Sequence, residues 1–273
     1  MGRYLEHLQR LLKAMAPKPR LFARAVNTVQ AGCSAYRFSR AYKDTFQEAD
    51  TQVPSSRNPL WEYFHNHKDG HGIWKWEHYF DIYHRHFSRF VGGKVNVLEI
   101  GIYSGGSLEM WRSYFGERSH IYGVDIEEAC KAYENDHVSV FIGDQADRAF
   151  WSSFRKNVEG IDILIDDGGH TPRQQQVTLE EMLQHIRPGG VYLCEDVHGC
   201  FNRFSAFAAG LVRDLNRMNI IPGSPNLNST VSGFQSSINS IHFYPYVVVI
   251  EKHRTRPSIL SSSKQGTEWQ SFL

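Results

Sequence analysis

Residues 95–111 read VNVLEIGIYSGGSLEMW, and this stretch decides the fold class. Its first half is mostly apolar, which is typical of a strand buried on both faces of a sheet. The pattern of residues from Ser107 to Phe115 is typical of a helix. Between the two patterns lies a loop that holds Gly101, Gly105 and Gly106. The stretch therefore predicts a strand, a tight turn and a helix, which is the opening of a βαβ unit.

The same alternation continues toward the C-terminus. Further strand patterns cover Ile121–Ile126, Val138–Ile142, Ile161–Ile165 and Val191–Cys194. Helical patterns between and after them cover Ala146–Asn157, Pro172–Ile186 and Phe201–Met218. Two last β segments, Ser240–Tyr244 and Tyr246–Glu251, fit a closing antiparallel hairpin. We therefore predict an α/β, Rossmann-like fold with a mostly parallel seven-stranded sheet. The segments 188–190 and 221–236 are predicted as a turn and a loop.

The composition sets limits on the class of protein. The 273 residues hold 30 Lys and Arg against 29 Asp and Glu, and 41% are hydrophobic. A chain of this length buries roughly 75% of its unfolded surface, which suits one domain with an extension. The near-neutral charge lacks the basic footprint of a nucleic-acid binder, and we expect no nucleic-acid partner. No apolar run is long enough for a transmembrane segment. Four cysteines without a CxxC pair fit a cytoplasmic protein.

The N-terminal 60 residues differ from the remainder, with ten Lys and Arg against four Asp and Glu. Apolar residues from Tyr4 to Met15 lie on one face of a predicted helix that Pro17 ends. This helix could pack on its own domain or a sister subunit, lie on a membrane surface, or be an organellar presequence. It does not resemble a secretory signal. We predict an extension and linker over 1–60, the main domain over 61–254 and a tail over 255–273. Within the main domain, the aromatic and histidine-rich residues 76–90 are predicted to be helical.

Acidic residues mark the predicted strand ends, where ligands bind in parallel sheets. Asp125 follows the second strand and suits both ribose hydroxyls of either NAD or S-adenosylmethionine. Asp144 follows the third strand and suits either an adenine amino group or a plain surface turn. Glu99 lies inside the first strand, where a carboxylate suits a cofactor with a cationic portion better than a pyrophosphate.

Two acidic groups stand at adjacent strand ends. The first is IDDGGH at 165–170, and the second is EDVH at 195–198. Four carboxylates in one crevice repel each other unless a cation neutralises them. Carboxylate oxygens select a hard divalent ion such as Mg²⁺. The alternative is that these side chains only solvate loop ends.

Several runs resemble the class I S-adenosylmethionine-dependent methyltransferases. They are LEIGIYSGGSLEMW, YGVDI, GDQAD, IDDGGH and RPGGVYLCEDVH, and the similarity covers about residues 70–252. More narrowly, they resemble the metal-dependent O-methyltransferases of the macrolide-sugar and cephalosporin-hydroxylase-like group. Macrolide-sugar members carry a longer region before the first strand than this chain does.

The resemblance implies specific roles. His170 matches the family's general base, and the metal ligands are Asp167, Glu195 and Asp196. The segment 71–87 matches a region that helps close the active site. The implied cofactor contacts are Glu99, Gly101, Tyr103, Ser104, Ser107, Asp125, Ile126, Asp144, Gln145 and Asp166.

The resulting hypothesis is an O-methyltransferase that uses S-adenosylmethionine and Mg²⁺, or another hard divalent cation. His170 would accept the proton of a small-molecule hydroxyl, and a sugar or glycosylated natural product is the expected acceptor, ahead of a phenol. We expect a homo-oligomer. A nicotinamide-dependent oxidoreductase stays open, although GxGxxG is absent, as do a non-catalytic cofactor-binding or scaffold protein and a metal-dependent oxygenase or hydrolase.

Overall fold

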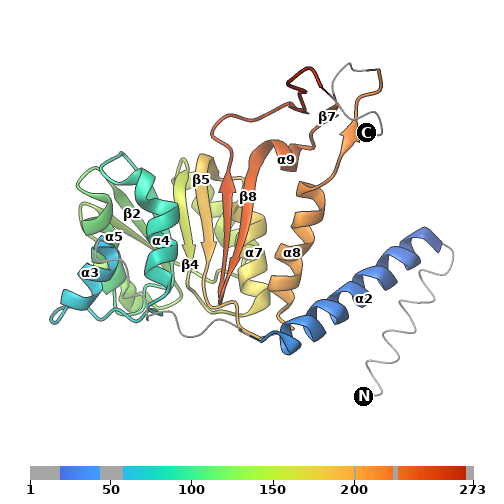
Figure 1. The fold of residues 1–273 in the computed structure, drawn as a ribbon. Helices are drawn as coiled ribbons and strands as arrows, with labels where there is room; N and C mark the ends of the chain where they lie inside the picture. Colours follow the sequence, from blue (N-terminus) through green and yellow to red (C-terminus); the bar gives the residue numbers. More distant parts are fainter. Residues whose placement is uncertain (1–18, 44–57, 200, 224–226, 269–273) are drawn as a thin grey trace. The chain divides into compact units, whose positions relative to one another are not determined.

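The structure is a computed structural model that describes residues 19–43, 58–199, 201–223 and 227–268 (Figure 1). Two compact units divide at Ser55, and the second runs from Ser56 to Leu273. The first unit contains α2 (Pro19–Ala41), whose described side chains, from residue 27 onward, are all exposed. The predicted helix over residues 4–15 and most of the predicted linker lie outside the described residues. No described helix is both long and apolar enough to span a membrane.

A seven-stranded sheet in the order β3-β2-β1-β4-β5-β9-β8 forms the centre of the second unit. Its first five strands are parallel, and β9 pairs antiparallel with both β5 and β8. The strands are β1 (Asn96–Ile100), β2 (His120–Asp125), β3 (Val138–Ile142), β4 (Ile161–Asp166), β5 (Ile186–Cys194), β8 (Ile238–Tyr244) and β9 (Val247–Lys252). The predicted fold class is confirmed. Because the strand order reverses between β1 and β4, a crevice is expected beyond their carboxyl ends.

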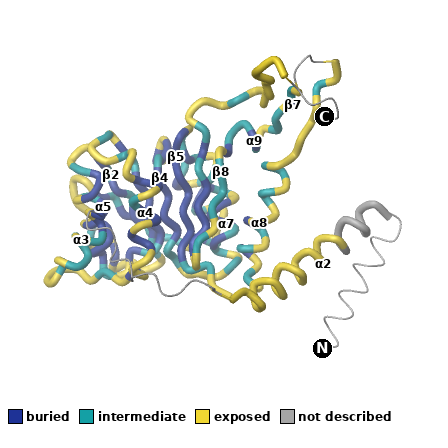
Figure 2. Tube along the Cα trace, in the orientation of Figure 1, coloured by how far each residue is buried: buried dark blue, intermediate teal, exposed yellow. Residues whose placement is uncertain are grey.

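Helices cover both faces of this sheet. Consecutive side chains of a strand point to opposite faces, and in the central strands both sets are buried. Val97 of β1 belongs to a core shared with α3, α4 and α5, whereas Leu98 belongs to a second core with α6, α7 and α8. Figure 2 shows the central strands in dark blue because both faces are buried. The helices are α3 (Pro59–Asn66), α4 (Tyr79–Phe87), α5 (Gly106–Phe115), α6 (Arg148–Asn157), α7 (Pro172–Met182), α8 (Arg203–Leu215) and α9 (Gly233–Ser237), with 3-10 turns η1 (Ser88–Phe90) and η2 (Glu128–Tyr133).

Several predicted boundaries were wrong. The predicted turn at 188–190 lies within β5, which begins at Ile186, and a register shift against β4 accommodates it. Helix α7 correspondingly ends at Met182. Its start is as predicted, with Thr171 as the N-cap in a capping box. The segment 221–236, predicted as a loop, contains a strand and α9. A small second sheet joins β6 (Asn219–Ile220), β7 (Asn228–Thr230) and β10 (Ile259–Ser261), the last in the predicted tail.

Candidate functional site

The predicted site residues converge on a cavity of about 930 Å³ at the carboxyl ends of the parallel strands. The ends of β1, β2, β4 and β5 line it, together with the segment 72–79 from before the sheet. Of the fourteen predicted residues, twelve line the cavity; Glu99 and Asp166 are buried behind it. Both contact residues that line the cavity: Glu99 accepts a hydrogen bond from Ser107, and Asp166 accepts one from Gln145.

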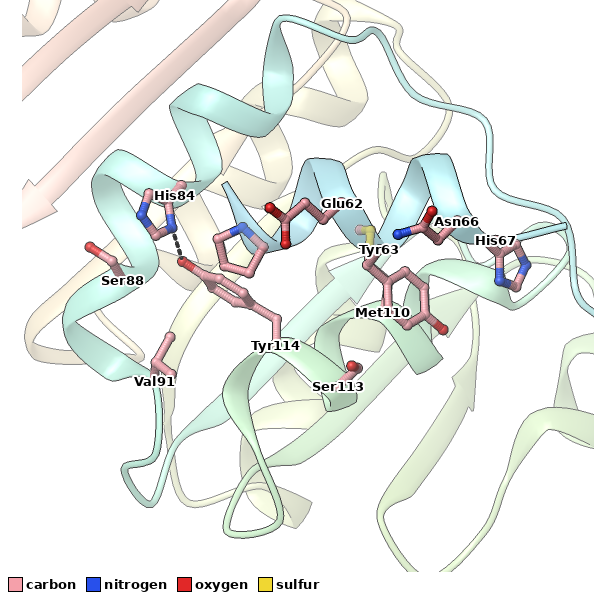
Figure 3. Close-up of a pocket in the computed structure, with 11 residues that line it drawn as sticks. Glu62, Tyr63, Asn66, His67, His84, Ser88, Val91, Met110, Ser113 and Tyr114 are labelled. Atoms are coloured by element: carbon pink, nitrogen blue, oxygen red, sulfur yellow. Dashed lines mark hydrogen bonds between the residues drawn. The ribbon is translucent and has the colours of Figure 1, made fainter. Parts of the chain in front are cut away.

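A second hollow of about 700 Å³ lies between α3, α4 and α5 (Figure 3). His84 and Tyr114 form a hydrogen bond of 2.8 Å at one side of it. None of the predicted site residues lies there. The acidic residues and His170 line the cavity at the strand ends instead, so we place the candidate site in that cavity.

The glycine-rich loop after β1 is shaped by close backbone contacts. Gly101 has a φ of +88°, and a Cβ there would lie 2.1 Å from the carbonyl oxygen of Asp167. At Gly106 a Cβ would lie 2.2 Å from the carbonyl oxygen of His71. These glycines thus let the loop touch the end of β4 and let the segment around His71 pack over the start of α5.

Asp125 at the end of β2 organises the same loop. Its Oδ2 accepts hydrogen bonds from the backbone N–H groups of Ile102 and Tyr103 at 2.8 and 3.1 Å. Its Oδ1 accepts from the N–H of Glu127 at 3.0 Å. Since Oδ2 already accepts two N–H groups, Oδ1 is the oxygen with capacity for a further donor, such as a ribose hydroxyl.

Gln145 links the third strand end to the fourth. Its amide nitrogen donates to Asp166 Oδ1 at 2.8 Å, and its amide oxygen accepts from the N–H of Gly169 at 2.7 Å. The buried Asp166 also accepts from the Tyr192 hydroxyl at 3.2 Å. Burial raises the pKa of Asp166 to about 6 despite these hydrogen bonds. Asp166 therefore orients Gln145 and the IDDGGH turn from behind.

Lys75 is the functional residue that the sequence reasoning missed. Its side chain is buried, and its ammonium lies 2.5 Å from Asp167 Oδ2, 3.1 Å from Glu195 Oε2 and 3.6 Å from Glu99 Oε1. Burial by itself lowers the pKa of a lysine, but Asp167, Glu195 and Glu99 hold that of Lys75 well above its usual value. The only signal in the sequence was a lysine between Trp74 and Trp76 in an aromatic segment.

The two buried glutamates, Glu195 and Glu99, each accept hydrogen bonds from neighbouring side chains. Glu195 accepts from the Tyr83 hydroxyl at 2.7 Å as well as from Lys75. Glu99 accepts from the Ser107 hydroxyl at 2.7 Å. Burial raises the pKa of both carboxyls, and Lys75 opposes that rise. A cation is therefore needed wherever these two carboxylates are ionised.

Asp196 forms the outer part of the site. Its Oδ1 accepts from the Tyr79 hydroxyl at 2.7 Å and from Trp76 Nε1 at 3.2 Å. Its Oδ2 lies 3.6 Å from His170 Nε2. One ligand atom each from Asp167, His170 and Asp196 lie within 4.8 Å of one another. Asp167 therefore belongs both to the Lys75 cluster and to this outer group.

Backbone strain is concentrated at the same place. Among the described residues, four that are not glycine have left-handed φ values: Tyr103, His170, Asp196 and Tyr246. The first three line the cavity, and the ring of Tyr246 packs against Trp76 and His198 at its edge. Such conformations are unfavourable and gather at functional sites, where the surrounding structure holds them.

The chain is similar to known methyltransferases. Residues 98–197 match the family model described as a methyltransferase domain. The chain is 34% identical over 182 residues to demethylmacrocin O-methyltransferase of Streptomyces fradiae, which covers 63% of this chain and 40% of that protein. It is 28% identical over 200 residues to 8-demethyl-8-alpha-L-rhamnosyl tetracenomycin-C 2'-O-methyltransferase of Streptomyces olivaceus, covering 67% and 52%.

A solved structure is similar over the same region. It is the MycE methyltransferase from the mycinamycin biosynthetic pathway in complex with Mg, SAH and mycinamycin VI. The TM-score is 0.57 at 27% identity, and the match covers 72% of this chain and 53% of that one. The chain thus spans about half the length of the proteins that it matches.

Proposed function

We propose that this chain, which contains a class I methyltransferase domain, is an O-methyltransferase that uses S-adenosylmethionine. One observation carries the proposal: a single cavity joins the glycine-rich loop and Asp125 to a cluster of three carboxylates and a histidine. The first set suits the cofactor, and the second suits activation of a hydroxyl group. Relatives named as O-methyltransferases support the reaction class.

The cofactor would lie along the ends of β1, β2 and β3. The loop at Gly101 offers backbone groups to the methionine part, and Asp125 offers a carboxylate oxygen to the ribose. Asp144 and Gln145 line the side of the cavity where an adenine would lie. The residues proposed along this side are Glu99, Gly101, Tyr103, Ser104, Ser107, Asp125, Ile126, Asp144, Gln145 and Asp166, of which Glu99 and Asp166 act from behind.

The carboxylate cluster fits a hard divalent cation such as Mg²⁺. Asp167, Glu195 and Asp196 supply oxygen donors, and a positive group, the Lys75 ammonium, already lies between two of them. We propose these three as metal ligands. When bound, the metal would lower the pKa of a coordinated hydroxyl and fix its direction. Mg is present in the MycE complex, which supports the same ion here.

His170 is the proposed base. Its side chain lines the cavity and is 41% exposed, and its Nε2 lies 3.6 Å from Asp196 Oδ2. The hydroxyl oxygen forms the new bond to the methyl carbon, while the bond from that carbon to the sulfonium sulfur breaks. The hydroxyl proton goes to His170. The other residues of the cavity hold the two reactants in line.

The acceptor that the site supports best is a hydroxyl of a sugar or of a glycosylated small molecule. The exposed side chains of Trp74 and Trp76 line the cavity and offer flat apolar surfaces to a ring. A relative whose name specifies a rhamnosyl acceptor supports this choice.

Calorimetric titration with S-adenosylhomocysteine in the presence of Mg²⁺ tests the proposal. We expect micromolar binding, followed by methylation of members of a glycoside panel that a chelator suppresses. Folded protein that gives no heat of binding would overturn the methyltransferase assignment. Binding without methylation of any alcohol in a broad panel would favour a non-catalytic cofactor-binding protein.

A further inference from the structure

We infer that Lys75 is the resident counter-ion of the carboxylate cluster, and that a divalent cation binds there by displacing its ammonium group. Lys75 would then be a positioning residue that sets the affinity of the metal site. The inference rests on the metal site of the proposed function. It goes beyond that function because it states that the Lys75 ammonium and the metal ion compete for the same carboxylates.

The contacts place the ammonium group at the centre of the inner cluster. Lys75 Nζ contacts Asp167, Glu195 and Glu99 within 3.6 Å, and only 3% of its side chain is exposed. Among the ion pairs of the described residues, it is the one partner of all three carboxylates. With all three carboxylates ionised, the inner cluster would carry more negative than positive charge, which attracts a second cation.

Asp167 is where the two cations would compete. Its Oδ2 receives the shortest contact of Lys75, at 2.5 Å, and Asp167 also converges with His170 and Asp196 on the outer group. A metal on Asp167 would lie close to the ammonium, and two positive charges at such a distance repel strongly in a buried site. Glu195 presents the same conflict, since Lys75 lies 3.1 and 3.3 Å from its two oxygens.

The chain around Lys75 connects this exchange to the cavity wall. Trp76 donates to Asp196 at 3.2 Å, while Trp74 is 85% exposed. Upstream, the carbonyls of His71 and Gly72 lie against Gly106 too closely for any larger residue there. If Lys75 leaves the cluster, the two neighbouring indoles change their surroundings. Because Trp76 also donates to the proposed ligand Asp196, the tryptophan fluorescence reports occupation of the site independently of catalysis.

The experiment measures Mn²⁺ binding directly, by electron paramagnetic resonance of the free ion, without cofactor or acceptor. Wild type is compared with Lys75→Met, which keeps an unbranched side chain one atom shorter and removes its charge. We expect Lys75→Met to bind Mn²⁺ on the order of tenfold more tightly or better. Mg²⁺ should also shift the tryptophan emission, at lower Mg²⁺ concentration in Lys75→Met than in wild type, because Trp76 donates to the proposed ligand Asp196.

Lys252 offers a matched control. It is a second buried lysine, but it donates to the backbone carbonyls of Leu183 and Ile186, away from the cluster. The Mn²⁺ affinity of Lys252→Met should stay within about threefold of the wild-type affinity. This change is smaller than the roughly tenfold gain expected for Lys75→Met. If Lys75→Met fails to fold, Lys75→Met combined with Glu99→Gln removes one buried charge of each sign and is measured in its place.

Unchanged or weaker Mn²⁺ binding in folded Lys75→Met would overturn the inference and leave the metal site of the proposed function standing. Absence of Mn²⁺ binding in both wild type and the variant would overturn both. The titration with S-adenosylhomocysteine then shows whether the methyltransferase assignment survives without a metal.

Discussion

The hydroxyl of Tyr79, at the start of α4, donates a 2.7 Å hydrogen bond to Oδ1 of Asp196, which lies 117 positions later in the chain. This bond connects the helix that precedes the sheet to the strand end that carries the outer carboxylate. Asp196 has a left-handed φ of 53°, so its side chain depends on such partners for its direction. Burial and the neighbouring carboxylate raise the pKa of Tyr79, which keeps its hydroxyl a donor.

Tyr79→Phe should therefore weaken the site without unfolding the domain. We expect a loss of roughly tenfold to a hundredfold in methyl transfer or metal affinity, as for other partners that orient a ligand. Stability should fall by about 1 kcal/mol. Steady-state kinetics and urea unfolding measure the two effects. Tyr63→Phe on α3 is the control, and equal kinetics in both variants would show that the Asp196 bond has no role.

His170→Ala should lower turnover by roughly 10²–10⁴-fold, because the acceptor proton then lacks its base. Affinity for S-adenosylhomocysteine should stay close to that of wild type. His198→Ala is a matched control, since His198 also lies near Asp196, with Nε2 3.3 Å from Oδ1. Single-turnover assays separate chemistry from binding. Unchanged turnover in His170→Ala, or a larger loss in His198→Ala, would assign the base elsewhere.

Asp167→Asn should abolish the activity that a chelator suppresses, because it removes the carboxylate shared by both clusters. Cofactor binding should persist, which calorimetry can verify. Asp162→Asn provides the comparison, since Asp162 stands at the other end of β4 and pairs with Arg187 at 3.0 Å. Metal-dependent activity retained in Asp167→Asn would remove Asp167 from the ligand set.

The folded protein is expected to lose stability in acid as Glu251 becomes protonated. Its hydrogen bond with His86, aided by Arg89, lowers the pKa of this carboxyl to about 2, although burial opposes the shift. Because the folded pKa lies below the unfolded value, the stabilisation is complete above about pH 4.5 and is lost as the pH falls toward 2. Glu251→Gln should therefore be less stable than wild type at pH 6, and the difference should shrink by pH 3. Urea unfolding at both pH values measures this, and a constant difference would contradict it.

How much could be read from the sequence depends on where each residue lies. The strand Val138–Ile142 was recognised with the observed bounds, because Val, Phe and Ile favour the extended conformation. Asp125, Asp167 and Asp196 were recognised because carboxylates directly after parallel strands must share one edge of the sheet. The expected homo-oligomer and cytoplasmic location stay predictions.

The start of β5 and the depth of Glu99 and Asp166 were not readable from local pattern. Pro188 and two glycines are typical of a turn, yet they lie within β5, between Ile186 and Val191, which both pair with β4. Side-chain alternation likewise does not say whether a carboxylate at a strand end faces the cavity or the layer beneath it.

By itself, the sequence determined the order of the strands along the chain and the acidic residues at their ends, because burial and turn chemistry act through neighbouring residues. Only the tertiary structure decided that Lys75 enters the carboxylate cluster. Lys75 and Glu195 are 120 positions apart, and no periodicity relates them. Their contact arises because the segment before the sheet folds across the strand ends, where a buried lysine is stable only among opposite charges.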